Sequence, residues 1–291
     1  MTRPNIVFII TDQQRHDTIK ALGHDHMITP NLDKMVEAGV AFTNMYATSP
    51  VCSPSRASLF SGLYPHDTGV LRNDDRWAYT WVPVLAAAGY RCVNVGKMHT
   101  HPFEAPLGFH ERHVTENKDR AHPSLPFYLD NWDKALWACG ETKPSRLTYC
   151  HRADYGERLG AFVWELPEKL HPDVFVGQSA VEWLRSYKGD EPFFLQVGLP
   201  GPHPPYDPTA DALALYDGVT FREPIRGYEL DNQPMALRKL RENHMANDHD
   251  AVVHLADPTP EQTQRQRAHY AANITMIDAQ LGALKEALAA R

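Results

Sequence analysis

A cysteine, a proline and an arginine stand close together where the sequence predicts the start of a helix. Proline is favoured at the first helical position and serine is a good N-cap, so Ser53 and Pro54 predict a helix from residue 54 to about residue 62. Cys52 then lies at the helix N-terminus, where unpaired N–H groups and the dipole favour an anion. Arg56 follows Cys52 by four residues and can contact the same anion.

Two other interpretations of Cys52 stay open on these residues alone. A cysteine at the start of an ordinary helix is often buried and inert. A helix N-terminus beside an arginine also lowers the pKa of a thiol, which would make Cys52 a thiolate nucleophile. Cysteine phosphatases, however, place their arginine further from the cysteine so that the loop can wrap a phosphate, and the spacing to Arg56 does not fit that loop.

An acidic residue and an amide follow the first predicted strand directly. Asp12 and Gln13 come after the apolar run 5–10, at the carboxyl end where ligands gather in open α/β sheets. Carboxylate and amide oxygens suit a hard cation such as Ca²⁺ or Mg²⁺ better than Zn²⁺. An aspartate at a strand end can also be a simple turn or cap residue.

Basic residues follow two more predicted strands. Lys97 and His99 come after strand 91–95, and their alternate positions point both side chains to one side of an extended segment. His203 follows strand 193–197, and the near-neutral pKa of histidine suits proton transfer. Carboxyl ends of parallel strands share one edge of a sheet, so these residues are expected to meet Asp12 there.

The segment 52–62, Cys-Ser-Pro-Ser-Arg-Ala-Ser-Leu-Phe-Ser-Gly, resembles the sulfatase signature Cys-x-Pro-Ser-Arg followed by Ser/Thr-Gly. The pair Lys97-x-His99 and the run 202–205, Pro-His-Pro-Pro, also match elements of that family in the same order. The resemblance covers residues 5–288. Gln13 departs from the usual Asp-Asp pair and is similar to the branch that includes choline sulfatases and phosphonate monoester hydrolases.

The resemblance implies that Cys52 is oxidised to formylglycine, whose hydrated aldehyde is the nucleophile, and that a formylglycine-generating enzyme is a partner. It also implies a divalent metal, with Ca²⁺ preferred over Mg²⁺ or Mn²⁺, bound by Asp12, Gln13 and residue 52. Arg56 and the metal would neutralise the charge that develops on the sulfate. The substrate would be a small-molecule sulfate ester, cleaved by a sulfuric ester hydrolase.

Four further roles follow from the same resemblance. Lys97 would stabilise the formylglycine diol and bind substrate. His99 would be the base that expels sulfate and regenerates the aldehyde. His203 would contact the sulfate and its bridging oxygen as the general acid, and Asn73 would line the substrate pocket.

One family motif is not found in the sequence. In sulfatases a Thr/Ser-x-Asp-(His/Asn)-Gly motif follows the long helix that corresponds to 263–290 and supplies further metal ligands, whereas here the sequence ends at Arg291. The chain is therefore expected to be the N-terminal portion, 1–291, of a sulfatase catalytic domain. The alternatives are a phosphonate or phosphate ester hydrolase on the same scaffold, a catalytically incomplete fragment without the second metal half-site, and a structural protein with an unmodified Cys52.

Composition excludes several classes of function. The 291 residues carry 29 Lys and Arg against 36 Asp and Glu, a net charge of -7, which argues against a nucleic-acid partner. No apolar run approaches the length of a membrane span, so no membrane association is expected. The four cysteines form no disulfide or Cys-x-x-Cys metal pattern. With no leader visible before the first strand, a cytoplasmic location is expected.

The elements that must position these residues alternate in type, which predicts an α/β fold with a mostly parallel sheet sandwiched by helices, of the alkaline-phosphatase-like kind that the resemblance implies. Strands are expected at 5–10, 40–46, 91–95 and 193–197, and helices at 29–38, 54–62, 82–88, 173–187 and 263–290.

Two regions lack clear periodicity. Residues 101–170 are rich in aromatic residues and predict a variable insertion that shapes the substrate pocket, or else a plain surface excursion. Residues 207–260 are polar and irregular, and a solvated loop is expected there. His244, His249 and His254 within it recur at a five-residue spacing that fits no standard metal site.

Overall fold

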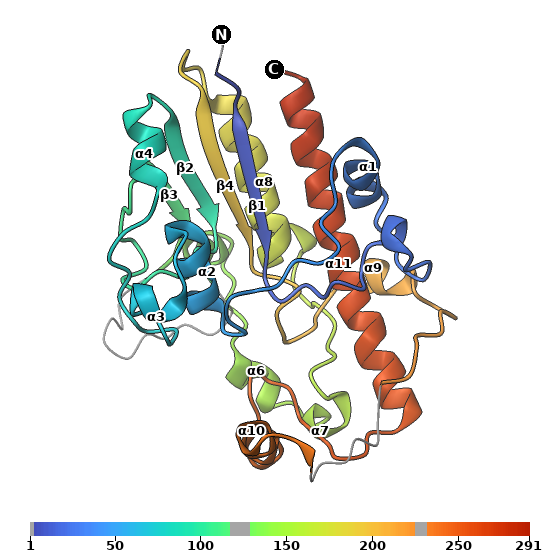
Figure 1. The fold of residues 1–291 in the computed structure, drawn as a ribbon. Coiled ribbons are helices and arrows are strands. Elements are labelled where there is room, and N and C mark those ends of the chain that lie inside the picture. The colour runs from blue at the N-terminus through green and yellow to red at the C-terminus, as the bar shows by residue number, and fades with distance from the viewer. Residues whose placement is uncertain (1–2, 117–128, 225–231) are drawn as a thin grey trace.

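The computed structural model describes residues 3–116, 129–224 and 232–291. A four-stranded parallel sheet forms its centre, in the order β1-β4-β2-β3 (Figure 1). The strands are β1 (Ile6–Thr11), β2 (Arg91–Gly96), β3 (Glu111–Val114) and β4 (Phe193–Leu199). The α/β fold with a parallel sheet is confirmed.

The register of the strands brings their carboxyl ends to one edge of the sheet. Thr11 of β1 pairs with Leu199 of β4, and Gly96 of β2 pairs with Gly198 of β4. Every residue of β4 is buried, as expected of a central parallel strand covered on both faces. The segments that follow β1, β2 and β4 therefore leave the sheet side by side.

Helices cover both faces of the sheet (Figure 1). α8 (Pro172–Ser186) and α11 (Pro260–Ala289) pack on one face, where Val95 and Val197 join a core cluster with Ile277 of α11. α2 (Cys52–Ser61) and α4 (Val82–Ala87) pack on the other face, where the core cluster includes Phe60 and Phe194. Alternate residues of each strand supply the two clusters, which is the two-residue period of a strand buried on both sides.

The remaining elements are short and lie around this core. They are η1 (Lys20–Leu22), α1 (Pro30–Ala38), α3 (Pro65–Thr68), α5 (Asn131–Ala138), α6 (Arg146–Cys150), α7 (Tyr155–Arg158), η2 (Glu168–Leu170), α9 (Ala210–Ala214) and α10 (Met235–Ala246).

Three expectations from the sequence are wrong. Residues 40–46 form no strand, and Val40, Phe42 and Tyr46 are exposed, because this segment pairs with no strand among the residues that the structure describes. The region 101–170 is not wholly an insertion, since β3 within it extends the sheet. The region 207–260 is not wholly a loop, since it contains α10. Phe127 and Tyr128, which stood out in the first of these regions, lie outside the described residues.

None of the helices in the described ranges has both the length and the apolar character that a membrane crossing requires.

The close approach of β2 and β4 leaves no room for a side chain at Gly198. A Cβ atom there would lie 1.9 Å from the Lys97 carbonyl oxygen. We expect Gly198→Ala to lower the free energy of unfolding by about 2 kcal/mol or more, because the backbone on both sides must move. Gly156→Ala is the matched control, since a Cβ atom there meets nothing within 4 Å. Urea unfolding of both variants is the measurement, and equal stabilities would contradict the packing described here.

Candidate active site

Backbone hydrogen bonds between the strand ends fix the base of the site. The Lys97 N–H donates to the Gly198 carbonyl at 2.7 Å, and the Asp12 N–H donates to the Gly201 carbonyl at 2.9 Å. The Gly201 N–H donates in turn to the carboxylate of Asp173 in α8, at 2.7 Å. The loops after three strands are thus tied to one another and to a helix.

Cys52 is the first residue of α2 and lies at its N-terminus, as predicted, but the cap differs from the expectation. The helix begins two residues before Pro54, and Ser53 does not cap it. Instead the Ser53 hydroxyl accepts a hydrogen bond from Trp77 Nε1 at 3.0 Å. The Asn73 side-chain oxygen accepts from the Ser53 N–H at 3.2 Å and from the Cys52 thiol at 3.4 Å. Asn73 therefore satisfies the helix N-terminus from outside the helix.

The Asp12 carboxylate lies between two buried cations. It forms ion pairs with the Lys97 ammonium and with Arg56, whose Nη2 lies 3.5 Å from Oδ2. The Arg56 Nη1 also donates to the Lys97 carbonyl at 2.7 Å. Burial alone would raise the pKa of Asp12, but Lys97 and Arg56, with His203 beyond them, hold it well below its usual range.

Three potential ligand atoms gather beside this ion-pair cluster. An oxygen of Asp12, the sulfur of Cys52 and a nitrogen of His99 all lie within 4.8 Å of one another. The structure thus brings together two of the three predicted metal ligands and adds His99, which the sequence assigned as a base. Gln13 follows Asp12 but is exposed and lines a separate cavity.

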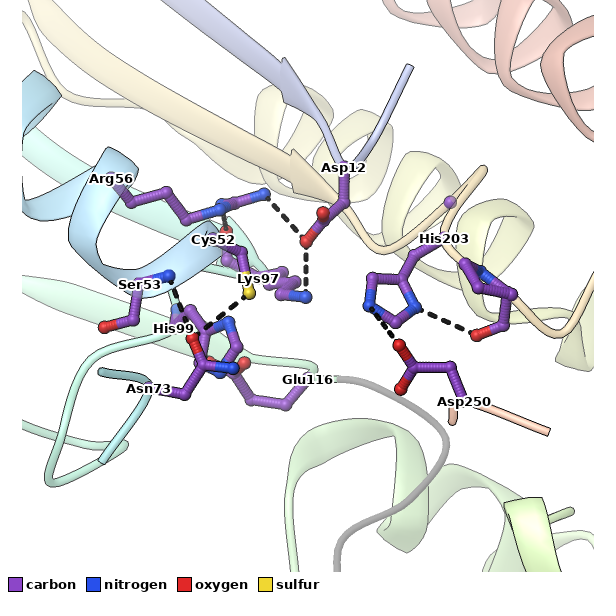
Figure 2. Close-up of polar contacts among 12 residues, drawn as sticks. Asp12, Cys52, Ser53, Arg56, Asn73, Lys97, His99, Glu116, His203 and Asp250 are labelled. Atoms are coloured by element: carbon purple, nitrogen blue, oxygen red, sulfur yellow. Dashed lines mark hydrogen bonds and ion pairs between the residues drawn. The ribbon is translucent and has the colours of Figure 1, made fainter. Parts of the chain in front are cut away.

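Glu116 supports His99 and was not found from the sequence. Its side chain accepts a hydrogen bond from the His99 N–H at 3.0 Å, where His99 has a positive φ of 64° (Figure 2). The Glu116 N–H in turn donates to Asp130 at 3.0 Å. Both acids lie in the region 101–170, where nothing in the sequence pattern separates them from surface carboxylates.

His203 lies across the site from α2 and contacts another residue that the sequence did not single out. Its Nδ1–H donates to the Pro204 carbonyl at 2.9 Å, and its Nε2 lies 3.7 Å from Asp250 Oδ2 (Figure 2). Burial, reinforced by the charge of Lys97, lowers the pKa of His203 to about 4, although Asp12 and Asp250 oppose the shift. Asp250 belongs to the polar region 207–260, whose composition alone predicted solvent exposure.

The long helix α11 anchors the loop after β1. The Tyr270 hydroxyl donates to the Gln13 carbonyl at 2.7 Å and accepts from the Arg15 N–H at 2.8 Å. Gln13 has a positive φ of 64°, a strained conformation for a residue with a side chain. A cavity of about 310 Å³ lies beside this loop, and its lining includes Arg15, Arg267 and Phe221.

The three histidines of the region 207–260 do come together, although their sequence spacing argued against it. The ring of His244 lies 5.8 Å from that of His249 and 5.1 Å from that of His254, centre to centre. Their ligand atoms are not close enough to share a metal ion. Among the described residues, that condition is met by Asp12, Cys52 and His99.

The chain belongs to the sulfatase family, whose model matches residues 4–291. It is 29% identical to an arylsulfatase of Clostridium perfringens over 96% of this chain and 58% of that protein. It is 27% identical to a choline-sulfatase of Rhizobium meliloti over 98% of this chain and 54% of that protein. The chain thus spans between half and two thirds of the length of these relatives.

Solved structures show the same fold. The phosphonate monoester hydrolase of Agrobacterium radiobacter superposes with a TM-score of 0.73 at 23% identity, over 99% of this chain and 60% of that one. Together with the family match, this confirms the alkaline-phosphatase-like α/β fold predicted from the sequence. Members of the sulfatase family generally use a divalent metal and a formylglycine.

The buried, neutral state of His203 predicts a pH dependence of stability. With a folded pKa of about 4 and an unfolded value of about 6.5, the unfolded chain binds a proton in this window that the folded chain does not. Stability therefore falls as the pH drops from 6.5 towards 4. We expect wild type to lose about 2 to 3 kcal/mol more than His203→Gln between pH 7.5 and 4.5. Urea unfolding at both pH values measures this, and parallel losses would contradict the burial of a neutral imidazole.

Proposed function

We propose that this chain forms the nucleophile-bearing part of a formylglycine-dependent sulfuric ester hydrolase that cleaves sulfate monoesters. The observation that carries the proposal is the position of Cys52. It lies at a helix N-terminus, in the Cys-x-Pro-Ser-Arg sequence, within 4.8 Å of ligand atoms of Asp12 and His99. Arg56 and Lys97 lie against the same Asp12 carboxylate.

The charge of the cluster suits an anionic substrate. One carboxylate, that of Asp12, is set against two cations whose side chains are at most 5% exposed. The excess positive charge lies in a site with little water, where Coulomb interactions are stronger than at a surface. The planar guanidinium of Arg56 and the N-terminus of α2 can both hold sulfate oxygens.

The residues present also fit the cation that the family uses. Asp12 offers a carboxylate, and conversion of Cys52 to formylglycine replaces a soft sulfur with oxygen, which Ca²⁺, Mg²⁺ and Mn²⁺ prefer. Of the three expected ligands, Asp12 and residue 52 lie together and would hold the cation, with Ca²⁺ preferred, whereas Gln13 is exposed and lines a separate cavity. The cation would polarise a sulfate oxygen and favour deprotonation of the hydrated aldehyde.

The hydrated aldehyde supplies a nucleophilic hydroxyl for sulfur and a second hydroxyl for the release of sulfate. Lys97 is buried beside it and stabilises negative charge there. His99, fixed by Glu116, removes the proton of the second hydroxyl. His203, once protonated at Nε2 as well, donates that proton to the leaving alcohol, while its Nδ1–H stays on the Pro204 carbonyl.

Phosphonate or phosphate ester hydrolysis on the same scaffold is the second candidate, favoured by Gln13 where sulfatases usually carry a second aspartate. Sulfate and phosphate esters share tetrahedral geometry but differ in charge. The phosphonate monoester carries one charge, as the sulfate does, so the two candidates are separated by comparing kcat/KM for matched 4-nitrophenyl sulfate, phosphate and phosphonate esters: a sulfatase turns over the sulfate best.

Modification of Cys52 is the first prediction from this proposal. Co-expression with a formylglycine-generating enzyme, the proposed partner, should lower the mass of the peptide that carries residue 52 by roughly 18 Da. Hydration restores the nominal mass, so an aldehyde-reactive probe is run alongside. Cys92, buried in β2, is the internal control and should stay a thiol. An unmodified thiol at residue 52 under these conditions would exclude the formylglycine mechanism.

Metal affinity is the second prediction. Asp12 and residue 52 offer about two protein ligands, because Gln13 lines a separate cavity, whereas Ca²⁺ takes roughly six to eight. We expect residues 1–291 to bind Ca²⁺ weakly and to turn over 4-nitrophenyl sulfate poorly. A longer polypeptide that adds the family's Asp-(His/Asn) pair should bind tightly and react. Calorimetric titration and turnover of both lengths, each with Asp12→Asn as control, measure this. Tight binding by the short chain that survives Asp12→Asn would place the metal elsewhere.

A further inference from the structure

A single carboxylate oxygen of Asp250 connects the buried His203 to the protein surface. Asp250 Oδ2 lies 3.7 Å from His203 Nε2 and 2.7 Å from His249 Nδ1. The other oxygen, Oδ1, forms an ion pair with Arg146 of α6. The His203 and Asp250 side chains are 11% and 12% exposed, whereas that of His249 is 67% exposed. The three side chains thus run from the interior of the site to solvent.

A general acid at His203 requires a source of protons. A general acid gives up one proton in each turnover and must recover it before the next. His203 is buried and, with its pKa lowered to about 4, is neutral near pH 7. Its Nδ1–H is held by the Pro204 carbonyl, which leaves Nε2 as the nitrogen that exchanges a proton, and Nε2 faces Asp250 (Figure 2).

We propose that His249 and Asp250 form a proton relay that supplies His203 from solvent. This inference rests on the proposed function, in which His203 protonates the leaving alcohol. Asp250 and His249 do not touch the reacting atoms and act through His203. Arg146 holds the Asp250 carboxylate in the orientation that bridges the two histidines.

The transfers balance without any redox step. A proton passes from His249 Nδ1 to Asp250 Oδ2, from there to His203 Nε2, and then to the bridging oxygen of the ester as the S–O bond breaks and its electron pair goes to that oxygen. His249 takes a proton from solvent at Nε2 as it releases the one at Nδ1, and hydrolysis of the ester as a whole returns one proton to solvent. The separation of 3.7 Å at His203 is longer than a hydrogen bond, so this step needs one bridging water or the tightening that substrate binding brings.

The charges around the relay favour its direction. Lys97 opposes a proton on His203, while Asp12 and Asp250 favour it. On the solvent side, the ring of His244 lies between two others, 5.8 Å from that of His249 and 5.1 Å from that of His254. The Asp250 carboxylate lies between this exposed cluster and His203, 2.7 Å from His249 Nδ1.

Histidine ¹⁵N NMR of the 291-residue chain tests the relay without turnover. The variants are Asp250→Asn and, as matched control, Asp217→Asn, which removes an exposed carboxylate from the same region. Because an opposite charge within ~4–6 Å shifts a pKa by about 1 unit or more, Asp250→Asn should lower the pKa of His203 by about that amount. Asp217→Asn should leave the pKa of His203 unchanged. Unshifted titration of His203 in a folded Asp250→Asn chain would overturn the proposal.

Turnover by the converted, full-length enzyme then separates a relay from a merely structural role. An alkyl sulfate needs a proton on its leaving oxygen, whereas 4-nitrophenolate leaves without one. Asp250→Asn and His249→Gln should lower kcat for the alkyl ester by about 100-fold and change that for 4-nitrophenyl sulfate little. Added imidazole should rescue His249→Gln. Equal losses for both esters would refute the relay, while an inactive wild type would refute the proposed function and leave the NMR result standing.

Discussion

The arrangement of the site depends on one buried ion-pair cluster, in which the Asp12 carboxylate is held between Lys97 and Arg56. These residues come from the end of β1, the end of β2 and helix α2, so the cluster fixes three elements relative to one another. Burying three charges is costly, and removing one partner of such a group typically costs about 3–5 kcal/mol because it leaves an uncompensated charge. The charged side chains of this cluster are already removed from water, so a bound cation or sulfate ester would not have to desolvate them.

Groups far away in the sequence complete the support of the site. Tyr270 of α11 clamps the strained backbone at Gln13, Glu116 holds the backbone of His99, and Asp250 faces His203. Tyr270 and Glu116 lie in segments that carry none of the proposed chemistry, whereas Asp250 belongs to the proposed relay. The contacts of Tyr270 and Glu116 orient the backbone of site residues, which is the positioning that catalysis depends on.

The described sheet is open at β1, and the segment 40–46, which follows α1, carries exposed apolar side chains at Val40, Phe42 and Met45. An unpaired strand edge and an apolar patch of this kind favour contact with further polypeptide.

The sequence by itself determined the strands that precede Asp12, Lys97 and His203, since buried parallel strands are typically rich in apolar residues. It also determined the Cys52–Arg56 motif at a helix N-terminus, because local spacing sets which side chains share a helical face. Only the tertiary structure decided that Asn73 and not Ser53 satisfies that helix start, that residues 40–46 form no strand, and that Asp250 meets His203. A cap, a strand and an ion pair each need a partner, and the partner's place depends on the packing of the whole chain and not on the local pattern.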